Sequence, residues 1–372
     1  MTSKLARLFA AATAIQAAGA ACASQYNLQP PQTIIAREIY DLHTLIMWII
    51  LGIFVVVFGA MTYAIVKHRK SVGHKAEQFH ENTTVEIVWT IIPFVILIGM
   101  AYPATKTIIS MKDSSNPDMT IKATGYQWKW SYDYLQEGIS FYSSLATPRE
   151  QIEGDAPKGA NYLLEVDNPV VVPVGKKVRI IITANDVIHA WWVPALGVKQ
   201  DAIPGFVRDS WFKVDTPGIY RGQCAELCGK DHGFMPIVVE AVEPGKYSAW
   251  VAEQKEKMAK TAVADAPDKP WTLDELKARG EKVYGANCVA CHQATGMGVP
   301  NAFPALSGSK VATGPKEAHI GTVLNGKPGT AMAPFKHMSD VEIAAVITYE
   351  RNSWSNKTGD MVTPGDVKAS RK

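Results

Sequence analysis

Two long apolar segments near the N-terminus limit what this chain can fold into. Residues 44–66 and residues 87–105 contain no Asp, Glu, Lys or Arg. A helix of 23 residues, the length of the first segment, spans about 34 Å, which is enough to cross the hydrocarbon core of a bilayer. Pro93 interrupts the second segment, and membrane helices tolerate such a proline. The sequence therefore predicts a transmembrane helix hairpin over residues 44–110.

The charges around the hairpin predict its orientation. The loop between the two apolar segments carries four basic residues, Lys67, Arg69, Lys70 and Lys75. By the positive-inside rule such a loop is cytoplasmic. We therefore expect a multi-pass protein of a bacterial inner membrane, with the N-terminal segment 24–43 and all later domains on the periplasmic face.

The first 23 residues have the pattern of an export signal. Lys4 and Arg7 form a short positive region, and an uncharged Ala-rich stretch follows, with small residues around Cys22 and Ala23. We therefore expect residues 1–23 to be a signal peptide. An amphipathic surface helix is the alternative, but the stretch has no charged face. Lipidation of Cys22 is a further alternative, although no leucine stands in the four residues before it.

The rest of the chain divides into a β-rich and a helical region. Between residues 118 and 243, short β-branched or apolar runs alternate with Pro, Gly, Asn and Asp, which is typical of a sandwich or barrel. Residues 251–270 are polar and rich in Ala and Lys without apolar periodicity, and we interpret them as a flexible linker. The predicted domains are a β domain at 111–250, a helical domain at 271–358 and a polar tail at 359–372.

Composition excludes several classes of function. The chain has 38 Lys and Arg against 35 Asp and Glu, a net charge of +3, and no long basic run, so nucleic-acid binding is not expected. Its five cysteines are too few for a disulfide scaffold. Apart from Cys22 they fall in two close pairs near histidines, which indicates metal or heme chemistry.

The first cysteine pair belongs to a compact run of soft metal ligands. Cys224 and Cys228 are followed by His232 and Met235, a set that favours copper over magnesium or calcium. Zinc would need four N or S ligands, and methionine binds zinc poorly. A Cys224–Cys228 disulfide is the structural alternative in an oxidising compartment, but it leaves the histidine and methionine unexplained. His189, at the end of a predicted strand, is the second imidazole ligand that we expect.

The second pair lies in the helical domain. Cys288-Val-Ala-Cys291-His292 has the pattern of c-type heme attachment, in which both thiols bind the heme covalently and the histidine binds iron. A predicted helix precedes this motif, and another begins with Ser339 as its N-cap. We expect Met332, in a proline-bounded loop, to be the second axial ligand. Ligation by histidine and methionine raises the heme potential.

Other residues compete for the second axial position. Met297 lies five residues after the histidine of the motif and cannot easily reach the opposite heme face. Met338 adjoins the last predicted helix, and we assign it to packing. His319 and His337 would be ligands only if Met332 is not, and we expect both on the surface.

The order of these motifs resembles subunit II of cytochrome c oxidase over nearly the whole chain. The two-helix hairpin, the aromatic stretch at 125–134 (GYQWKWSYDY), the segment around His189 and the residues DAIPG at 201–205 match that family in order. The resemblance implies a multidomain protein with a transmembrane hairpin, an all-β cupredoxin-like barrel that holds the binuclear copper centre CuA, and an all-α class I cytochrome c domain.

The resemblance also implies a role for each copper ligand. Cys224 and Cys228 would bridge two copper ions as thiolates. His189 and His232 would each hold one ion, and Met235 would be a weak thioether ligand.

Four further positions take their roles from the resemblance. Glu226 would bind copper through its backbone carbonyl and, through its side chain, a magnesium ion at the interface with subunit I. Trp128 matches the tryptophan through which electrons reach CuA, and barrel packing is its alternative role. Glu86 marks the mouth of a proton channel into subunit I, although an acid there is otherwise an interfacial anchor. Tyr126 stands where the family usually has histidine, which changes no copper ligand.

These features predict the electron-accepting subunit of a proton-pumping cytochrome c oxidase. Subunit I, subunit III and a cytochrome c-type donor are the expected partners, and O2 would be reduced to water in subunit I. The CuA subunit of a nitric oxide reductase and a membrane-tethered redox carrier are the alternatives. Quinol oxidase second subunits share the fold but lack the copper ligands. Because this chain has these ligands, a quinol oxidase subunit is disfavoured. A flexible linker would keep heme and copper at high effective concentration, so we expect the heme domain to accept electrons first.

Overall fold

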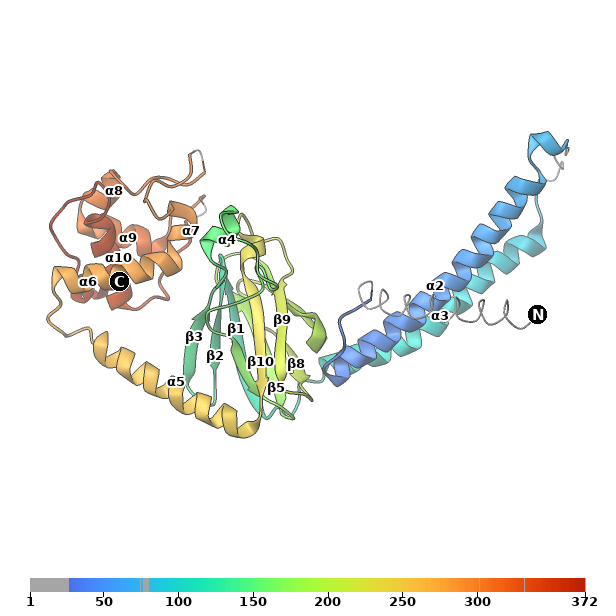
Figure 1. Ribbon diagram of the computed structural model, residues 1–372, viewed down its shortest axis with the longest axis horizontal. Helices are drawn as coiled ribbons and strands as arrows, with labels where there is room; N and C mark the ends of the chain where they lie inside the picture. Colours follow the sequence, from blue (N-terminus) through green and yellow to red (C-terminus); the bar gives the residue numbers. More distant parts are fainter. Residues whose placement is uncertain (1–26, 74, 76–79, 301, 331, 372) are drawn as a thin grey trace, which may run out of the picture. The chain divides into compact units, whose positions relative to one another are not determined.

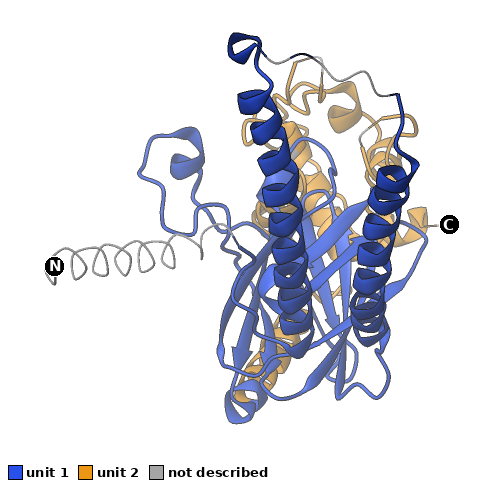
Figure 2. Ribbon diagram, turned by 90° about the vertical axis from the view of Figure 1, so that its right-hand side faces the viewer, with its two compact units in different colours: residues 1–248 blue, residues 249–372 orange. Residues whose placement is uncertain are grey.

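The computed structural model describes residues 27–73, 75, 80–300, 302–330 and 332–371. The expected signal peptide at 1–23, including Cys22, lies outside the described residues. The chain divides into two compact units, residues 1–248 and residues 249–372 (Figure 2).

Two long helices form the predicted hairpin (Figure 1). Helix α2 spans Ile34–Lys67 and α3 spans Thr83–Lys112, with the short 3-10 helix η1 at Lys70–Val72 between them. Both α-helices are long and apolar enough to cross a membrane. Helix α2 begins well before residue 44, because Thr33 caps its first turn by accepting a hydrogen bond from the Ala36 amide. Charged side chains such as Arg37 end the apolar pattern there but not the helix.

The ends of the hairpin are hydrogen-bonded to the β domain. The hydroxyl of Thr33 donates to the Leu196 carbonyl at 2.9 Å. The indole of Trp211 donates to the Ser110 carbonyl, in the last turn of α3, at 3.1 Å. The hairpin and the β domain are therefore joined by contacts from both helices.

The β domain contains two five-stranded sheets. The first has the strand order β3 (Ile139–Ser143), β2 (Lys129–Tyr134), β1 (Met119–Tyr126), β5 (Lys177–Ala184) and β8 (Arg208–Lys213). The second has the order β4 (Val170–Pro173), β10 (Pro236–Val242), β9 (Gly218–Cys224), β6 (His189–Val193) and β7 (Val198–Ala202). Pairs β1–β5 and β4–β10 are parallel and the other pairs are antiparallel. Three short helices lie in its connections: α4 (Arg149–Glu153), η2 (Pro194–Leu196) and η3 (His232–Phe234).

The core of the β domain is built from large aromatic side chains. Trp130, Tyr132 and Trp191 are fully buried, and the Trp191 indole donates to the Tyr132 hydroxyl at 3.1 Å. That bond satisfies polar atoms that would otherwise be costly to bury. Strand β5 alternates buried and half-buried residues along its whole length, which is the pattern of a strand with one face on the core.

The segment at 251–270 differs from the flexible linker that the sequence suggested. Helix α5 spans Pro244–Ala264 and buries none of its residues, so packing against a core does not explain it. It is supported instead by ion pairs one turn apart, Glu253–Lys257 and Glu256–Lys260, each at 2.7 Å. The expectation of a flexible coil is therefore wrong for residues 251–264.

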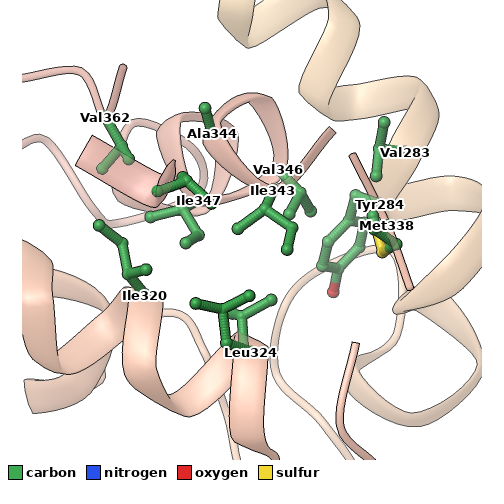
Figure 3. Packing of buried hydrophobic residues seen from close by; sticks show 12 residues of the cluster. Val283, Tyr284, Ile320, Leu324, Met338, Ile343, Ala344, Val346, Ile347 and Val362 are labelled. Atoms are coloured by element: carbon green, nitrogen blue, oxygen red, sulfur yellow. The ribbon is translucent and has the colours of Figure 1, made fainter. Parts of the chain in front are cut away.

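The second unit packs helices around one core. Its elements are α6 (Leu273–Asn287), α7 (Val289–His292), α8 (Lys310–Thr313), α9 (Lys316–Asn325), α10 (Asp340–Arg351) and α11 (Pro364–Ser370). In Figure 3, Ile320 and Leu324 from α9 lie opposite Ile343 and Ile347 from α10. Ser339 is the N-cap of α10, as predicted, and forms a reciprocal capping box with Glu342.

The C-terminal segment is part of this core rather than a polar tail. Val362 and Val367 are completely buried, and Thr363 caps α11 with a box closed by Asp366. The sequence pattern of 359–372 did not predict this burial, because two valines among polar residues are too few to produce an apolar periodicity.

Candidate metal centre

The predicted copper ligands meet because they end or begin neighbouring strands. Cys224 is the last residue of β9 and His189 is the first residue of β6, while Met235 directly precedes β10. Strands β10, β9 and β6 are consecutive in one sheet. The loop between β9 and β10 supplies Cys228 and His232. Sheet order thus brings residues 46 positions apart in sequence to one edge.

The donor atoms of these five residues lie within a few ångströms of one another. Cys224 Sγ is 3.8 Å from Cys228 Sγ and 3.9 Å from His189 Nδ1. Cys228 Sγ is 3.4 Å from His232 Nδ1 and 3.6 Å from Met235 Sδ. His189, both cysteines and Met235 are buried, and His232 is half-buried. Cys224 therefore lies next to His189 and Cys228 next to His232, and the two sulfurs lie next to each other.

The electrostatics of the cluster make Cys224 the thiolate of the cysteine pair. A hydrogen bond from Cys228, helped by His189, lowers the pKa of Cys224 well below the usual value of a thiol. The pKa of Cys228, which donates to that thiolate, is raised. Burial lowers the pKa of His189, but hydrogen bonds with Asp186 and Cys224 outweigh it and leave the pKa raised. Deprotonated sulfur is the form that binds metal.

The donor set fits copper. Both thiols are free, and their 3.8 Å separation is far longer than the roughly 2 Å bond of a disulfide, so the disulfide alternative is not formed. His189, Cys224 and Cys228 form a group able to hold a metal ion. Among biological cations, copper is the one for which thiolate, imidazole and thioether together are preferred ligands.

Trp128 lies against the copper loop. Its indole donates to the Cys228 carbonyl at 3.2 Å, and the side chain of Gln127 donates to the same oxygen at 2.9 Å. Trp128 is half-buried, whereas Trp130 is fully buried and packs edge-on to the His189 ring with centroids 6.0 Å apart. The structure thus separates an outer tryptophan on the copper loop from an inner one in the core.

Three residues of this site were not singled out from the sequence. Asp186 Oδ1 is 2.8 Å from Nε2 of His189, and Gln127 bonds the copper loop. Gly125 lies against the His189 ring, where an added Cβ would be 2.7 Å from Cδ2. The spacing Asp-x-x-His was a possible signal for the carboxylate. For Gly125 and Gln127 no signal existed, because their partners are distant in sequence.

The two acidic residues with implied roles have simpler surroundings. The Glu226 carbonyl lies 3.4 Å from Cys224 Sγ, and its side chain is exposed. No group of three or more His, Cys, Asp or Glu residues gathers around that side chain within the described ranges. Glu86 lies in the first turn of α3, in a shallow pocket with Thr83 and Thr90.

The heme-attachment motif forms a helical turn. Cys288 is the C-cap that follows α6, and Cys291 and His292 lie in α7. His292 Nδ1 is 2.9 Å from the Pro304 carbonyl, an acceptor that fixes the proton on Nδ1 and leaves the lone pair on Nε2, the atom that would bind iron. Neither thiol is in a disulfide within the part of the chain that the structure describes, so the motif fits covalent attachment of heme.

The candidates for the second axial position differ in burial. Met332 is half-buried in a loop, where its carbonyl accepts from the Lys327 amide at 3.0 Å. Met338 is buried in the core, and His337 is exposed, as expected. The expectation of a surface position is wrong for His319, which is buried with Nε2 2.8 Å from a Glu350 carboxylate oxygen. The sequence around His319 does not indicate this contact, because Glu350 is distant along the chain.

Comparison with known proteins agrees with this architecture. The family described as "Cytochrome C oxidase subunit II, transmembrane domain" matches residues 21–107, and "Cytochrome C oxidase subunit II, periplasmic domain" matches residues 119–242. A third family, "Cytochrome C oxidase, cbb3-type, subunit III", matches residues 275–349.

Individual relatives match the first two regions. The probable cytochrome c oxidase subunit 2 of Rickettsia bellii is 38% identical over 230 residues, which cover 62% of this chain and 84% of that protein. Cytochrome c oxidase subunit 2 of Cyanidium caldarium is 41% identical, over 61% of this chain and 89% of its own length. The periplasmic domain of the Bradyrhizobium japonicum subunit II, known from a crystal structure, is 46% identical in sequence to this chain. The match covers 39% of this chain and 98% of that domain, with a TM-score of 0.35.

Fold and site together define a membrane-anchored redox protein with a cupredoxin-like domain and a cytochrome c domain. Its copper site is the one implied for CuA, with His189, Cys224 and Cys228 at its centre. The chain belongs to the cytochrome c oxidase subunit 2 family, and its C-terminal domain implies a c-type heme.

Proposed function

We propose that this chain accepts electrons from a cytochrome c-type donor at its C-terminal domain and delivers them through its β domain to subunit I of a heme–copper oxidase. There O2 would be reduced to water, coupled to proton pumping. The observation that carries the proposal is the convergence of two thiols, two imidazoles and a thioether, in which each donor atom has a neighbouring donor 3.4–3.9 Å away.

The residues of the β domain would hold two copper ions and keep them from moving. Cys224 and Cys228 would bridge the ions, His189 and His232 would each complete one side, and Met235 would be the weak ligand. A binuclear copper centre supplies reversible one-electron storage. His189 and Cys224 are buried on adjacent strands, and Cys228 and Met235 are buried in the loop that follows. This burial restricts their movement, and a centre that changes shape little transfers electrons with little reorganisation.

Trp128 would be the residue through which electrons reach this centre. Its ring is half-buried and its indole N–H is bonded to the carbonyl of a ligand cysteine. It therefore offers a short path from the surface of the domain to Cys228. Glu226, whose carbonyl lies beside Cys224, would bind copper through that oxygen and magnesium through its exposed carboxylate, with further magnesium ligands from subunit I.

The membrane part supports the remaining assignments. The exposed apolar side chains of α2 and α3, such as Val56 and Ile109, require lipid or other subunits as neighbours, and subunits I and III are the proposed partners. The basic loop would face the cytoplasm and the β domain the periplasm. Glu86, at the loop-side end of α3, would then lie at the cytoplasmic mouth of a proton channel in subunit I.

An optical and electron paramagnetic resonance study of the purified complex tests the proposal. We expect a mixed-valence copper signal together with c-type heme bands. Cys224→Ser should abolish the copper signal and keep the heme, whereas the double change Cys288→Ser, Cys291→Ser should remove covalent heme and keep the copper signal. A complex whose copper signal survives Cys224→Ser contradicts the proposed centre. Co-purification of a heme–copper catalytic subunit tests the partner.

A further inference from the structure

The carboxylate of Asp186 joins two parts of the site that are distant in sequence. Its Oδ1 is 2.8 Å from Nε2 of His189 and also accepts the Val187 amide at 2.7 Å. Its Oδ2 accepts the backbone amide of Gln127 at 2.7 Å. The side chain is only 8% exposed, so these three donors are its solvation. One carboxylate thus contacts both a copper ligand and the turn that carries Trp128.

The contact with His189 determines which ring nitrogen faces the sulfurs. A carboxylate offers only acceptor atoms, so the proton lies on Nε2, and Nδ1 keeps its lone pair. Nδ1 is the atom directed at Cys224 Sγ, 3.9 Å away. A carboxylate behind a metal-binding histidine fixes its tautomer and orientation and increases its basicity.

The second histidine of the site has no such support. Among the described residues, the His232 ring is hydrogen-bonded only to Cys228 Sγ, and it is half-buried where His189 is completely buried. The two imidazoles therefore present unequal basicity and unequal rigidity to the metal ions that they would bind.

The contact with Gln127 extends the effect to the electron path. The backbone of Gln127 is bonded to Asp186, while its side chain and the indole of Trp128 are bonded to the Cys228 carbonyl. The turn between β1 and β2 is thus held on one side by Asp186 and on the other by the copper loop.

We propose that Asp186 is a positioning residue that fixes His189 as the stronger of two unequal imidazole ligands and ties it to the turn bearing Trp128. This inference rests on the proposed copper centre. It assigns no contact with the metal to Asp186, which acts through the two groups that it holds.

The test compares Asp186→Asn with Asp167→Asn in the full-length chain within the purified complex. Asp167 is a matched control, since it also accepts a backbone amide, that of Ser144 at 2.7 Å, but is exposed and touches no ligand. The covalent heme of the same chain reports export and assembly. Three properties are measured: copper affinity by chelator competition, the hyperfine pattern of the copper signal, and its reduction potential.

We expect Asp186→Asn to lower copper affinity about 10- to 100-fold, to change the hyperfine pattern and to shift the potential upward, because a negative charge beside the oxidised centre is lost. Asp167→Asn should match the unaltered protein. Asp186→Glu, which keeps the charge but moves it, should retain the potential better than the hyperfine pattern. A copper-free Asp186→Asn variant with an intact β domain also supports the proposal.

Two outcomes overturn it. One is an Asp186→Asn variant that equals the Asp167→Asn control in all three properties. The other is loss of the folded β domain in both Asp186 variants, seen as proteolysis of residues 119–242, which would show a purely structural role. Absence of a copper signal from the unaltered protein would instead contradict the proposed centre itself.

Discussion

Gly125 on β1 lies so close to His189 on β6 that the ring occupies the space of a side chain. A Cβ added to Gly125 would be 2.7 Å from Cδ2 and 2.9 Å from Cγ of the imidazole. Neither atom belongs to a flexible chain end, and the ring is fixed on its other side by Asp186. The glycine therefore defines the position of the histidine by leaving room for it.

Gly125→Ala should consequently displace His189 and weaken copper binding. Overpacking of this kind costs about 1–3 kcal/mol, so we expect copper affinity to fall about tenfold or more. Chelator competition on the purified complex measures it. Gly159→Ala is the matched control, since its nearest neighbour would be 3.9 Å away. Equal copper affinity in the two variants would show that the ring can move aside at no cost.

Met332→Leu tests the second axial ligand of the heme. We expect loss of the sulfur–iron absorption band and a lower heme potential, because thioether ligation raises the potential of c-type hemes. Met338→Leu is the control: this side chain is buried in the core, and a swap of similar volume should cost under about 1.5 kcal/mol with ligation unchanged. A sulfur–iron band that persists in Met332→Leu but disappears in Met338→Leu would reverse the assignment.

The Arg351–Asp360 pair predicts an acid sensitivity of the second unit. The buried guanidinium donates to both carboxylate oxygens at 2.8 Å. This contact lowers the pKa of Asp360 to about 2 from 3.8. A carboxyl with a lowered folded-state pKa stabilises the fold above its unfolded pKa and loses that contribution as pH falls. The relevant window is therefore between about pH 4 and pH 2.

Asp360→Asn should lower the free energy of unfolding of this unit at pH 7 by about 1–3 kcal/mol. Its deficit against the unaltered protein should shrink as pH falls from about 4 to 2, in denaturant titrations followed by heme absorption. Glu317→Gln, at an exposed position, is the control and should change neither the free energy of unfolding at pH 7 nor its dependence on pH. A deficit that stays constant over this range would show that the Asp360 charge is not what stabilises the unit.

Ending the chain after Ala264 should leave the copper site assembled. Helix α5 buries none of its residues, and the core of the second unit is its own. We expect an unchanged copper signal and continued reduction by small artificial reductants, but a sharp fall in turnover with the natural donor. Oxygen consumption with each donor measures this. Undiminished turnover with the natural donor would mean that electrons do not pass through the C-terminal domain first.

The cluster of candidate copper ligands could be anticipated because it contains unusual residues in a short span. Four of these candidates lie from Cys224 to Met235, and the structure brings them together in one loop. The supporting residues were not predictable, since an aspartate such as Asp186 is common and its partner Gln127 lies on another strand. Prediction from the sequence also failed for α5, which forms although none of its residues is buried. It failed for His319 because the burial of this residue depends on one distant partner, Glu350.

The carbonyl oxygen of Cys228 receives both the Trp128 indole and the Gln127 amide. That acceptor is part of the main chain, and every amino acid at position 228 would supply it. Mutation can therefore remove either donor but never the acceptor, and a cysteine variant that loses the metal would still keep the tryptophan docked. An amide-to-ester exchange after Cys228, which weakens the carbonyl without touching the sulfur, would act on the acceptor itself and so test the proposed electron path apart from the binding of the metal.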